Sequence, residues 1–361
     1  MNAPNPGLAP FSCTYSPQVP ELLSKLGISL AITTYQAGKI VFLSPKDEEF
    51  LVQLPRTLEK PMGIALKDNG RRMAIACLRD VITFTDSPEL AQSYPKAPKR
   101  YDALYMPRTS YHVGGLDLHD LEWSDQGLFA VNTLFSSLIQ IDGEYNYSTY
   151  WKPPFISELA SEDRCHLNGM AMENGLPKYA SMFNQGNTPQ SWRPEVTTAG
   201  TIMDVTTDEI LVEGLPMPHS PRMVNGELYV LLSATGGLAR IDRAAGTFEE
   251  IVNLKGFVRG MAIHGEFAFV GLSKLRQNSS TFKHLQIAQE SNQSGIKIVH
   301  LPTAAVVGEI LYQTSVDEIY DVQVIPGRRR PNLLNTLKDD HYLGLMTPEA
   351  TYWGRNTQAA Q

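Results

Sequence analysis

Short apolar segments recur along the chain in pairs, and each pair is joined by a turn of small or polar residues. The pattern reads SLAITTYQAGKIVFLS from Ser29, RMAIACLRDVITFTD from Arg72, LFAVNTLFSSLIQID from Leu128 and LYVLLSATGGLARID from Leu228. Two further copies are interrupted, because KYASMFNQGN resumes only at GTIMDV and FAFVGLSKLR only at GIKIVHL. Apolar runs of this length, separated by turn residues, predict β-hairpins.

A third apolar segment, ending in a Gly or Asn turn, precedes five of the hairpins: MGIALKDNG, HDLEWSDQG, NGMAMENG, SPRMVNG and RGMAIHG. A sixth such segment, YDVQVIPG, lies near the C-terminus, whereas the hairpin at Ser29 has none upstream. Circular closure supplies the missing partner if YDVQVIPG joins residues 29–54. The sequence therefore predicts an all-β, six-bladed β-propeller whose first blade is closed by a C-terminal strand. The alternative is seven blades, if residues 86–115 contain another.

Helical periodicity is confined to residues 19–27 and part of residues 283–291. We therefore expect an N-terminal extension over residues 1–18, a single propeller domain over residues 19–346 and a C-terminal tail over residues 347–361.

Composition narrows the classes of partner. A 42% hydrophobic content suffices for a large core, and a net charge of −7 without a basic stripe argues against nucleic-acid binding. No apolar run reaches the roughly 18 residues of a membrane span, and the N-terminal segment has no secretory signal pattern. The three cysteines are scattered, which argues against a disulfide framework. We expect a cytoplasmic protein with a small-molecule ligand and neither nucleic-acid nor membrane partners.

The predicted fold gathers residues that are distant in sequence, because the segments entering the inner strands all ring one central mouth. Three histidines, His119, His166 and His219, begin consecutive blades. Neutral imidazoles are common ligands of transition metals, so these three predict a site for a divalent ion, zinc or manganese. The alternatives are metal-free acid–base groups, or histidines that only satisfy hydrogen bonds at the start of a strand. Two aspartates, Asp117 and Asp120, flank His119. In an extended segment Asp117 faces the same side as His119, so it is the better candidate for a carboxylate that orients this imidazole.

Other polar residues at this mouth are candidates for catalysis or substrate binding. Arg259 offers a bidentate fork to a carboxylate, while Tyr320 or Asp321 could move a proton. The alternatives are an arginine bridging two blades and an aspartate capping a strand entry. The predicted substrate-binding residues lie at strand starts, turns and insertions: Asn132, Asn168, Asn184, Lys274, Arg276 and Trp192. Asparagines that form turns and a tryptophan that anchors its loop are the structural alternatives. Cys165 reads as a small buried hydrophobic residue, not a nucleophile.

Together these residues favour an enzyme that acts on a small polar or anionic substrate, carbohydrate-like or bearing a carboxylate. Lyase or hydrolase chemistry with a histidine-bound metal fits the set of side chains. The alternative is a non-catalytic propeller that binds a peptide or a glycan on the same face.

Several segments also carry a family resemblance: SLAITTYQAGKIVFL, GGLDLHDLEW, DRCHLNGMA, PHSPRM, GFVRGMA and VGLSKLR. Together they resemble a bacterial family of conserved hypothetical proteins, over roughly residues 11–330. The resemblance implies a predicted β-propeller that occupies nearly the whole chain, and it implies no reaction.

Overall fold

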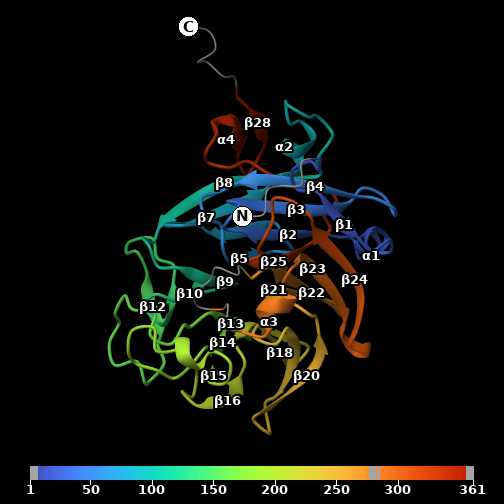
Figure 1. Cartoon of the computed structure of the whole chain (residues 1–361). Coiled ribbons are helices and arrows are strands. Elements are labelled where there is room, and N and C mark those ends of the chain that lie inside the picture. The colour runs from blue at the N-terminus through green and yellow to red at the C-terminus, as the bar shows by residue number, and fades with distance from the viewer. Residues whose placement is uncertain (1–6, 276–281, 283–284, 355–361) are drawn as a thin grey trace.

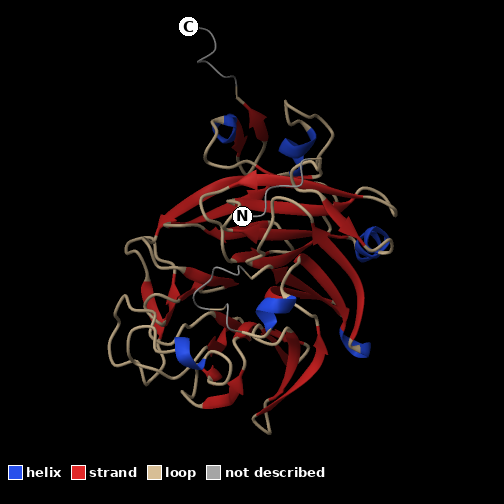
Figure 2. Cartoon of the chain, in the orientation of Figure 1, coloured by secondary structure: helices blue, strands red, loops and turns tan. Residues whose placement is uncertain are grey.

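Six sheets of four or five strands surround a central axis in the computed structural model, which describes residues 7–275, 282 and 285–354 (Figures 1 and 2). Each sheet forms one blade, and the six-bladed β-propeller predicted from the sequence is confirmed. Residues 86–115 do not form a seventh blade, because they supply α2 (Pro88–Gln92) and the fourth strand of blade 2.

Blade 1 closes the ring by joining distant parts of the chain. Its strands, from the axis outward, are β25 (Asp321–Pro326), β2 (Ile28–Thr34), β3 (Lys39–Pro45) and β4 (Leu51–Thr57). Strand β25 pairs antiparallel with β2, so the YDVQVIPG segment is the closing strand, as predicted. A second closure lies at the outer edge of blade 6, where β1 (Cys13–Tyr15) pairs with β24 (Ala305–Tyr312).

The remaining blades are continuous in sequence. Blade 2 contains β5 (Ile64–Lys67), β6 (Arg72–Ala76), β7 (Asp80–Asp86) and β8 (Ala103–His112). Blade 3 contains β9 (Leu118–Ser124), β10 (Gly127–Asn132), β11 (Ser137–Gln140) and β12 (Ser148–Trp151). Blade 4 contains β13 (Gly169–Glu173), β14 (Leu176–Met182), β15 (Gly200–Asp204) and β16 (Ile210–Leu215).

The last two blades follow the same order. Blade 5 contains β17 (Pro218–Val224), β18 (Glu227–Leu232), β19 (Gly237–Asp242) and β20 (Thr247–Asn253). Blade 6 contains β21 (Phe257–His264), β22 (Phe267–Ser273), β23 (Ser294–His300) and β24 (Ala305–Tyr312). The turns between first and second strands are tight; Asn174 and Gly175, for example, both have positive φ, as a type I′ hairpin turn requires.

Short helices and a hairpin decorate the blades. Helices α1 (Val19–Leu26) and α3 (Ile287–Glu290) lie in the two predicted helical regions, and 3₁₀ turns cover Arg193–Glu195 and Leu301–Thr303. Beyond blade 1, β26 (Pro331–Leu333) pairs parallel with β8. The chain then forms α4 (Asp340–Leu343) and a hairpin of β27 (Gly344–Met346) and β28 (Thr351–Trp353), which lies beside α2 (Figure 1).

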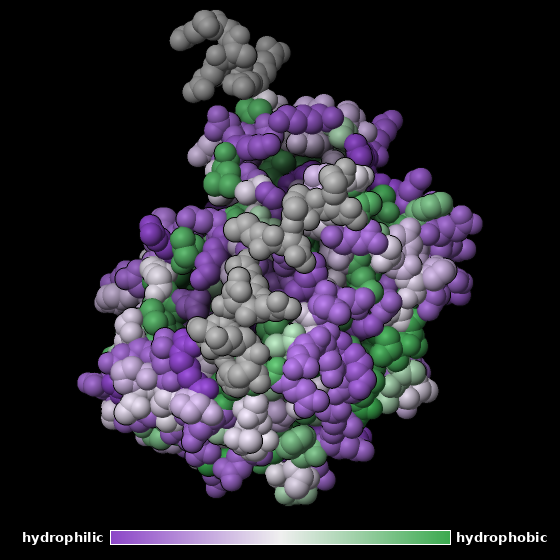
Figure 3. Space-filling view, in the orientation of Figure 1, coloured by the Kyte–Doolittle hydropathy of each residue, from purple (hydrophilic) through white to green (hydrophobic). Residues whose placement is uncertain are grey.

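The hydrophobic core lies between neighbouring blades. Ile32 and Val322 of blade 1, for example, pack with Phe269 and Ile298 of blade 6, all essentially unexposed. Burial of each such side chain contributes roughly 1.5–3 kcal/mol. Hydrophilic residues predominate on the face shown in Figure 3, and no helix among the described residues is long and apolar enough to cross a membrane.

Glycines let the inner strands approach closely at the axis. Gly63, Gly169 and Gly260 occupy matching places in blades 2, 4 and 6. A Cβ on Gly63 would lie 3.2 Å from Asp120 Cα, one on Gly169 2.5 Å from Pro221 Cδ, and one on Gly260 2.7 Å from Asp321 Cα. The recurring GIA and GMA sequences therefore mark where a blade lets the next blade's inner strand come close.

The other three blades carry polar side chains where these blades carry glycine. Asp321 Oδ2 accepts a hydrogen bond from Ile64 N at 2.8 Å, and Asp120 Oδ2 accepts one from Met170 N at 3.2 Å. Ser220 Oγ accepts one from Gly260 N at 3.2 Å. Blades 1, 3 and 5 thus bind the inner strands of blades 2, 4 and 6, which gives the six-bladed ring an approximate threefold pattern.

Candidate functional site

Hydroxyl groups fix the segments that lead into several inner strands. Thr133 Oγ1 donates to Leu167 O at 2.6 Å, Ser233 Oγ donates to Val258 O at 2.6 Å, and Ser273 Oγ donates to Ile319 O at 3.1 Å. Each hydroxyl follows or ends a second strand, and each acceptor directly neighbours a predicted site residue. The positions of His166, Arg259 and Tyr320 are therefore fixed by contacts between adjacent blades.

The mouth gathers aromatic and basic side chains from consecutive blades. The ring centroids of His119 and His166 are 5.0 Å apart, and His119 lies 5.6 Å from Tyr320. His219 joins the group through Phe183, whose ring lies 4.4 Å from His166 and 5.2 Å from His219. The structure thus brings together the three histidines that the sequence predicted, with a phenyl ring in contact with two of them.

Each of these histidines uses Nδ1 to bind the protein. His119 Nδ1 donates to the Asp117 carbonyl oxygen at 3.0 Å, and His166 Nδ1 lies 3.0 Å from Asp163 Oδ1. His219 Nδ1 lies 2.7 Å from Ser233 Oγ, whose own hydrogen is given to Val258 O. All three partners act as acceptors, so each neutral ring carries its hydrogen on Nδ1 and a lone pair on Nε2.

Burial keeps two of these imidazoles neutral. It lowers the pKa of His119 to about 3, with a further contribution from the positive charge of Arg259, and Asp117 only partly opposes it. Burial and Arg259 also lower the pKa of His219 well below its ordinary value. His119 and His219 are therefore hydrogen-bond acceptors at neutral pH.

Arg259 and Tyr320 are two polar groups at the mouth whose hydrogen-bonding capacity is not satisfied by the described residues. The Arg259 guanidinium carbon lies 3.6 Å from the centroid of the Tyr320 ring. Within the described part of the chain, Arg259 has no hydrogen-bond or ion-pair partner. The Tyr320 hydroxyl is buried and likewise unpartnered there, and burial raises its pKa well above the ordinary value, so it stays protonated. A guanidinium and a hydroxyl without acceptors define a place for an anionic group.

Three residues in the segments that lead to the mouth have left-handed backbone conformations. His166 has φ 50°, and Asp163 and Asp117 have φ 48° and 54°. Left-handed conformations cost non-glycine residues roughly 1–2 kcal/mol each and are found at sites where geometry is imposed by function or packing.

The metal prediction meets a geometric obstacle. Anchored Nδ1 atoms and free Nε2 lone pairs are the arrangement that metal-binding histidines use. However, no three His, Cys, Asp or Glu side chains within the described ranges are placed to hold one metal ion. Phe183 packs against both His166 and His219, which accounts for the failure of the rings to converge. His119, His166 and His219 therefore do not form a ready ligand set, and metal binding stays a prediction.

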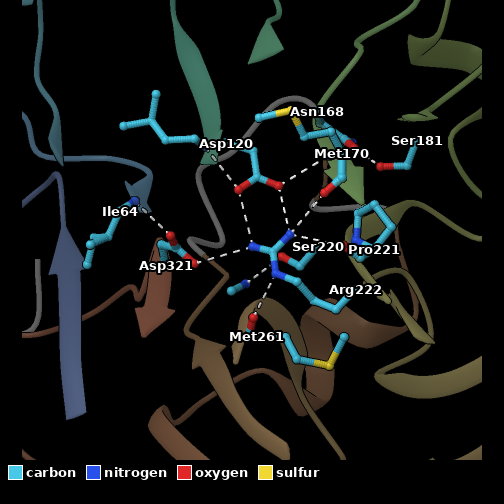
Figure 4. A network of polar contacts seen from close by, with 12 residues as sticks. Ile64, Asp120, Asn168, Met170, Ser181, Ser220, Pro221, Arg222, Met261 and Asp321 are labelled. Carbon is cyan, nitrogen blue, oxygen red and sulfur yellow. Dashed lines mark hydrogen bonds and ion pairs between the residues drawn. The ribbon is translucent and has the colours of Figure 1, made fainter. Parts of the chain in front are cut away.

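Asp321 faces the axis below the mouth instead of the histidines. Its carboxylate accepts from Ile64 N and Val322 N, both at 2.8 Å, and lies 3.9 Å from Arg222 (Figure 4). Adjacent residues of a strand point to opposite sides, which explains why the side chains of Tyr320 and Asp321 point in opposite directions. The structure therefore brings Tyr320, not Asp321, to the candidate site.

Arg222 is the centre of this axial network (Figure 4). Its guanidinium binds both carboxylate oxygens of Asp120, at 2.8 and 3.2 Å, and donates to Met261 O at 3.1 Å and Met170 O at 3.3 Å. Burial alone would lower the pKa of Arg222, but the carboxylates of Asp120, Glu122 and Asp321 hold it above its ordinary value. Arg222 thus contacts the inner strands of blades 3, 4 and 6 and lies near that of blade 1, which is a structural role.

The predicted substrate-binding residues make structural contacts, although the buried Nδ2 groups of Asn132 and Asn168 have no hydrogen-bond partner among the described residues. Asn132 Oδ1 accepts from Phe135 N in a turn, Asn168 Oδ1 accepts from Ser181 Oγ at 2.7 Å, and Asn184 Oδ1 accepts from Gly186 N. Lys274 Nζ forms an ion pair with Asp317 at 2.9 Å. Arg276 lies outside the described residues.

Trp192 is buried against the site instead of open to a ligand. Its ring lies 4.6 Å from that of His166, and its Nε1 donates to Asp163 Oδ2 at 3.1 Å. The insertion that carries Trp192 therefore holds the Asp163–His166 pair in place.

Cys165 is fully buried, and burial raises the pKa of its thiol to about 12, which agrees with its interpretation as a small hydrophobic residue.

Sequence reasoning missed three residues of the site: Asp163, Phe183 and Ser233. Asp163 stands three residues before His166, and only the left-handed turn between them brings the carboxylate to Nδ1. Ser233 and Phe183 end or follow second strands, at places matching Thr133 in the repeat. Alignment of the hairpin copies would have singled out that position.

The chain belongs to the family described as Domain of unknown function (DUF4915), whose model matches residues 17–334. The family resemblance expected from the sequence is thereby confirmed. No curated protein matches the sequence.

Solved structures share the propeller fold at low sequence identity. A chain of a nidogen/laminin complex has a TM-score of 0.53 and 10% identity, with 83% of this chain and 99% of that chain covered. A protein of unknown function from Bacteroides caccae has a TM-score of 0.51 and 10% identity, covering 82% and 98%. A catalytically inactive virginiamycin B lyase from Staphylococcus aureus with quinupristin has a TM-score of 0.42 and 13% identity, covering 86% and 82%. The first two likenesses establish the fold alone, and the third supports no inference.

Proposed function

We propose that the protein is an enzyme that binds a small carboxylate-bearing substrate at the mouth and transfers a proton, as lyases and hydrolases do. The observation that carries the proposal is the Arg259 guanidinium, which lies on the Tyr320 ring with no hydrogen-bond partner among the described residues. A half-buried guanidinium that lacks a partner gains most from a carboxylate, which it binds with two parallel hydrogen bonds.

Proton transfer is assigned to His166. Its Nδ1 hydrogen is held by the Asp163 carboxylate, so the lone pair of the neutral ring lies on Nε2, which we assign as the base. In a lyase step, Nε2 takes the proton from the carbon next to the substrate carboxylate, and the electron pair of that C–H bond becomes a C=C bond. The leaving group departs with its bonding electrons and receives the proton back from the imidazolium. Arg259 and the Tyr320 hydroxyl stabilise the negative charge that develops on the carboxylate.

A divalent transition metal, zinc or manganese, is the alternative partner proposed for the same histidines. The anchored Nδ1 atoms of all three rings favour it, and the separation of the rings in the described structure does not. A bound metal would supply a Lewis acid for the same substrate.

The experiment is a thermal-shift screen of small carboxylates, followed by NMR detection of turnover of every compound that raises Tm. The proposal predicts that at least one carboxylate both raises Tm and is converted, and that Arg259→Gln abolishes both effects. The matched control is Arg240→Gln, which changes an exposed arginine that pairs with Glu249. Binding without conversion of any compound would instead support the non-catalytic binding propeller.

A further inference from the structure

The hydrogen-bonding pattern of the mouth specifies more of the ligand than its carboxylate. We propose that the substrate is a polyhydroxylated carboxylate, with the carboxylate on Arg259 and hydroxyl groups donating to the Nε2 atoms of the histidines. This inference rests on the proposed function, because it concerns the same site.

The mouth combines hydrogen-bond donors with hydrogen-bond acceptors, and the His119 and Tyr320 rings that carry one of each are 5.6 Å apart. Arg259 can only donate to a ligand, and the protonated Tyr320 hydroxyl has a hydrogen to donate, because it lacks an acceptor among the described residues. The Nε2 atom of each neutral ring accepts, because Nδ1 carries the ring hydrogen. A ligand that satisfies both kinds of group needs an anionic acceptor group and, within a few ångströms, hydrogen-bond donors.

The donor groups on the ligand are neutral. Hydroxyl and ammonium groups both donate hydrogen bonds, but burial, with a further contribution from the positive charge of Arg259, lowers the pKa of His119 and His219 and so disfavours a positive charge at these rings. A ligand ammonium bound at the same Nε2 atoms would meet the same repulsion. Hydroxyl groups meet none, so the geometry points to a hydroxy acid, not an amino acid.

Buried acceptors make the selection strong. His119 and His219 have side chains that are more than nine-tenths buried. A ligand without hydroxyl groups would strip water from these nitrogens and leave them without donors, which costs about 1–3 kcal/mol per group. We therefore expect the site to bind carboxylates that lack hydroxyl groups much more weakly than hydroxylated ones.

The test uses four six-carbon probes and calorimetry on the full chain. D-Gluconate carries the carboxylate and the hydroxyls, hexanoate only the carboxylate, sorbitol only the hydroxyls, and norleucine a carboxylate with an ammonium. We expect gluconate to bind at least tenfold more tightly than the other three. His166→Leu, which removes the acceptor, should reduce the advantage of gluconate over hexanoate to less than threefold, and the Tm of the variant confirms that it is folded.

Two outcomes separate this inference from the function on which it rests. If hexanoate or norleucine binds as tightly as gluconate, and Arg259→Gln weakens that binding, the carboxylate site stands and the polyhydroxylated ligand is wrong. If no carboxylate binds in a manner that depends on Arg259, the proposed function and this inference both fail.

Discussion

The Nδ1 atom of His166 lies 3.0 Å from Oδ1 of Asp163, across a turn in which both residues have left-handed backbones. The Asp163 carboxylate also accepts from Trp192 Nε1, so the residue that orients the histidine is itself held by an insertion. An aspartate in this place fixes which nitrogen carries the hydrogen and leaves Nε2 as the base.

Asp163→Asn should therefore change the tautomer of His166 without unfolding the protein. An asparagine can turn its NH₂ group toward Nδ1, which moves the ring hydrogen to Nε2 and removes the base. We expect turnover of any substrate found in the screen to fall by roughly 10²–10⁴-fold. A ¹H–¹⁵N spectrum of the imidazoles measures the tautomer independently of any substrate.

The matched control for this variant is Asp80→Asn, since Asp80 makes the same kind of contact with the exposed His112 at 2.5 Å. That change should leave turnover and the His166 tautomer unaltered. An unchanged His166 tautomer in Asp163→Asn would contradict the orienting role of Asp163.

Arg222 should contribute to stability far more than a surface arginine. Its replacement by Met leaves the Asp120 carboxylate buried without a counter-charge and removes the contacts with Met170 and Met261. Breaking a buried pair in this way costs about 3–5 kcal/mol. Urea unfolding of Arg222→Met measures the loss.

Arg240→Met is the control for Arg222, because its pair with Glu249 is exposed on the outer strands of the same blade. Exposed pairs contribute about 0–1 kcal/mol. Equal losses in the two variants would show that the axial network does not hold the ring together.

Glu122 should make the folded state less stable as the pH rises. It follows Asp120 by two residues on β9, and burial beside two other carboxylates raises its pKa to about 8 from an ordinary 4.5. The unfolded chain loses this proton near pH 4.5 and the folded chain only near pH 8. Stability is therefore highest below the lower value and is lost as the pH rises toward the upper one.

Glu122→Gln should remove part of this pH dependence. At pH 4 the variant and the parent should melt together, and at pH 8.5 the variant should be more stable by at least about 1 kcal/mol. Glu209→Gln at an exposed position should show no difference at either pH. A Glu122→Gln variant less stable than the parent at pH 8.5 would contradict this assignment.

Metal content is decided by elemental analysis of protein purified without an affinity tag or chelator. The described geometry, in which Phe183 contacts both His166 and His219, predicts less than stoichiometric zinc or manganese. Stoichiometric metal that is lost in His166→Ala would show that the three rings converge on an ion after all, and would restore the metal-dependent lyase or hydrolase.

The repeat pattern sufficed to predict the blade count, the closing strand and the meeting of His119, His166 and His219 at one mouth. Each of these follows from strand period and ring closure, which depend on local patterns in the chain. The predicted role of Asp321 stays a prediction, but its carboxylate binds Ile64 N and Val322 N, because adjacent residues of an extended segment point to opposite sides and Tyr320 is the one that faces His119. The His166 partner could not be predicted, since Asp163 reaches Nδ1 only through two left-handed residues.

The distances between the three imidazole rings also could not be predicted from the sequence. Whether three imidazoles meet at one point depends on what fills the space around them, here Phe183 and Trp192 from a strand end and an insertion. The alternation of glycine with Asp120, Ser220 and Asp321 was visible in the repeats, but its meaning required the contacts between inner strands.

Gly169→Ala should test that alternation directly. The new methyl group would lie 2.5 Å from Pro221 Cδ and 2.8 Å from Ser181 Oγ, where two inner strands and a second strand meet. Overpacking of this kind costs about 1–3 kcal/mol, and Gly169 has no left-handed φ that would confuse the comparison. Gly143→Ala, with no atom within 4 Å of the added carbon, should leave the unfolding free energy nearly unchanged. If both variants unfold at the same urea concentration as the parent, the inner strands have room at the axis, and close approach is not the reason for glycine in blade 4.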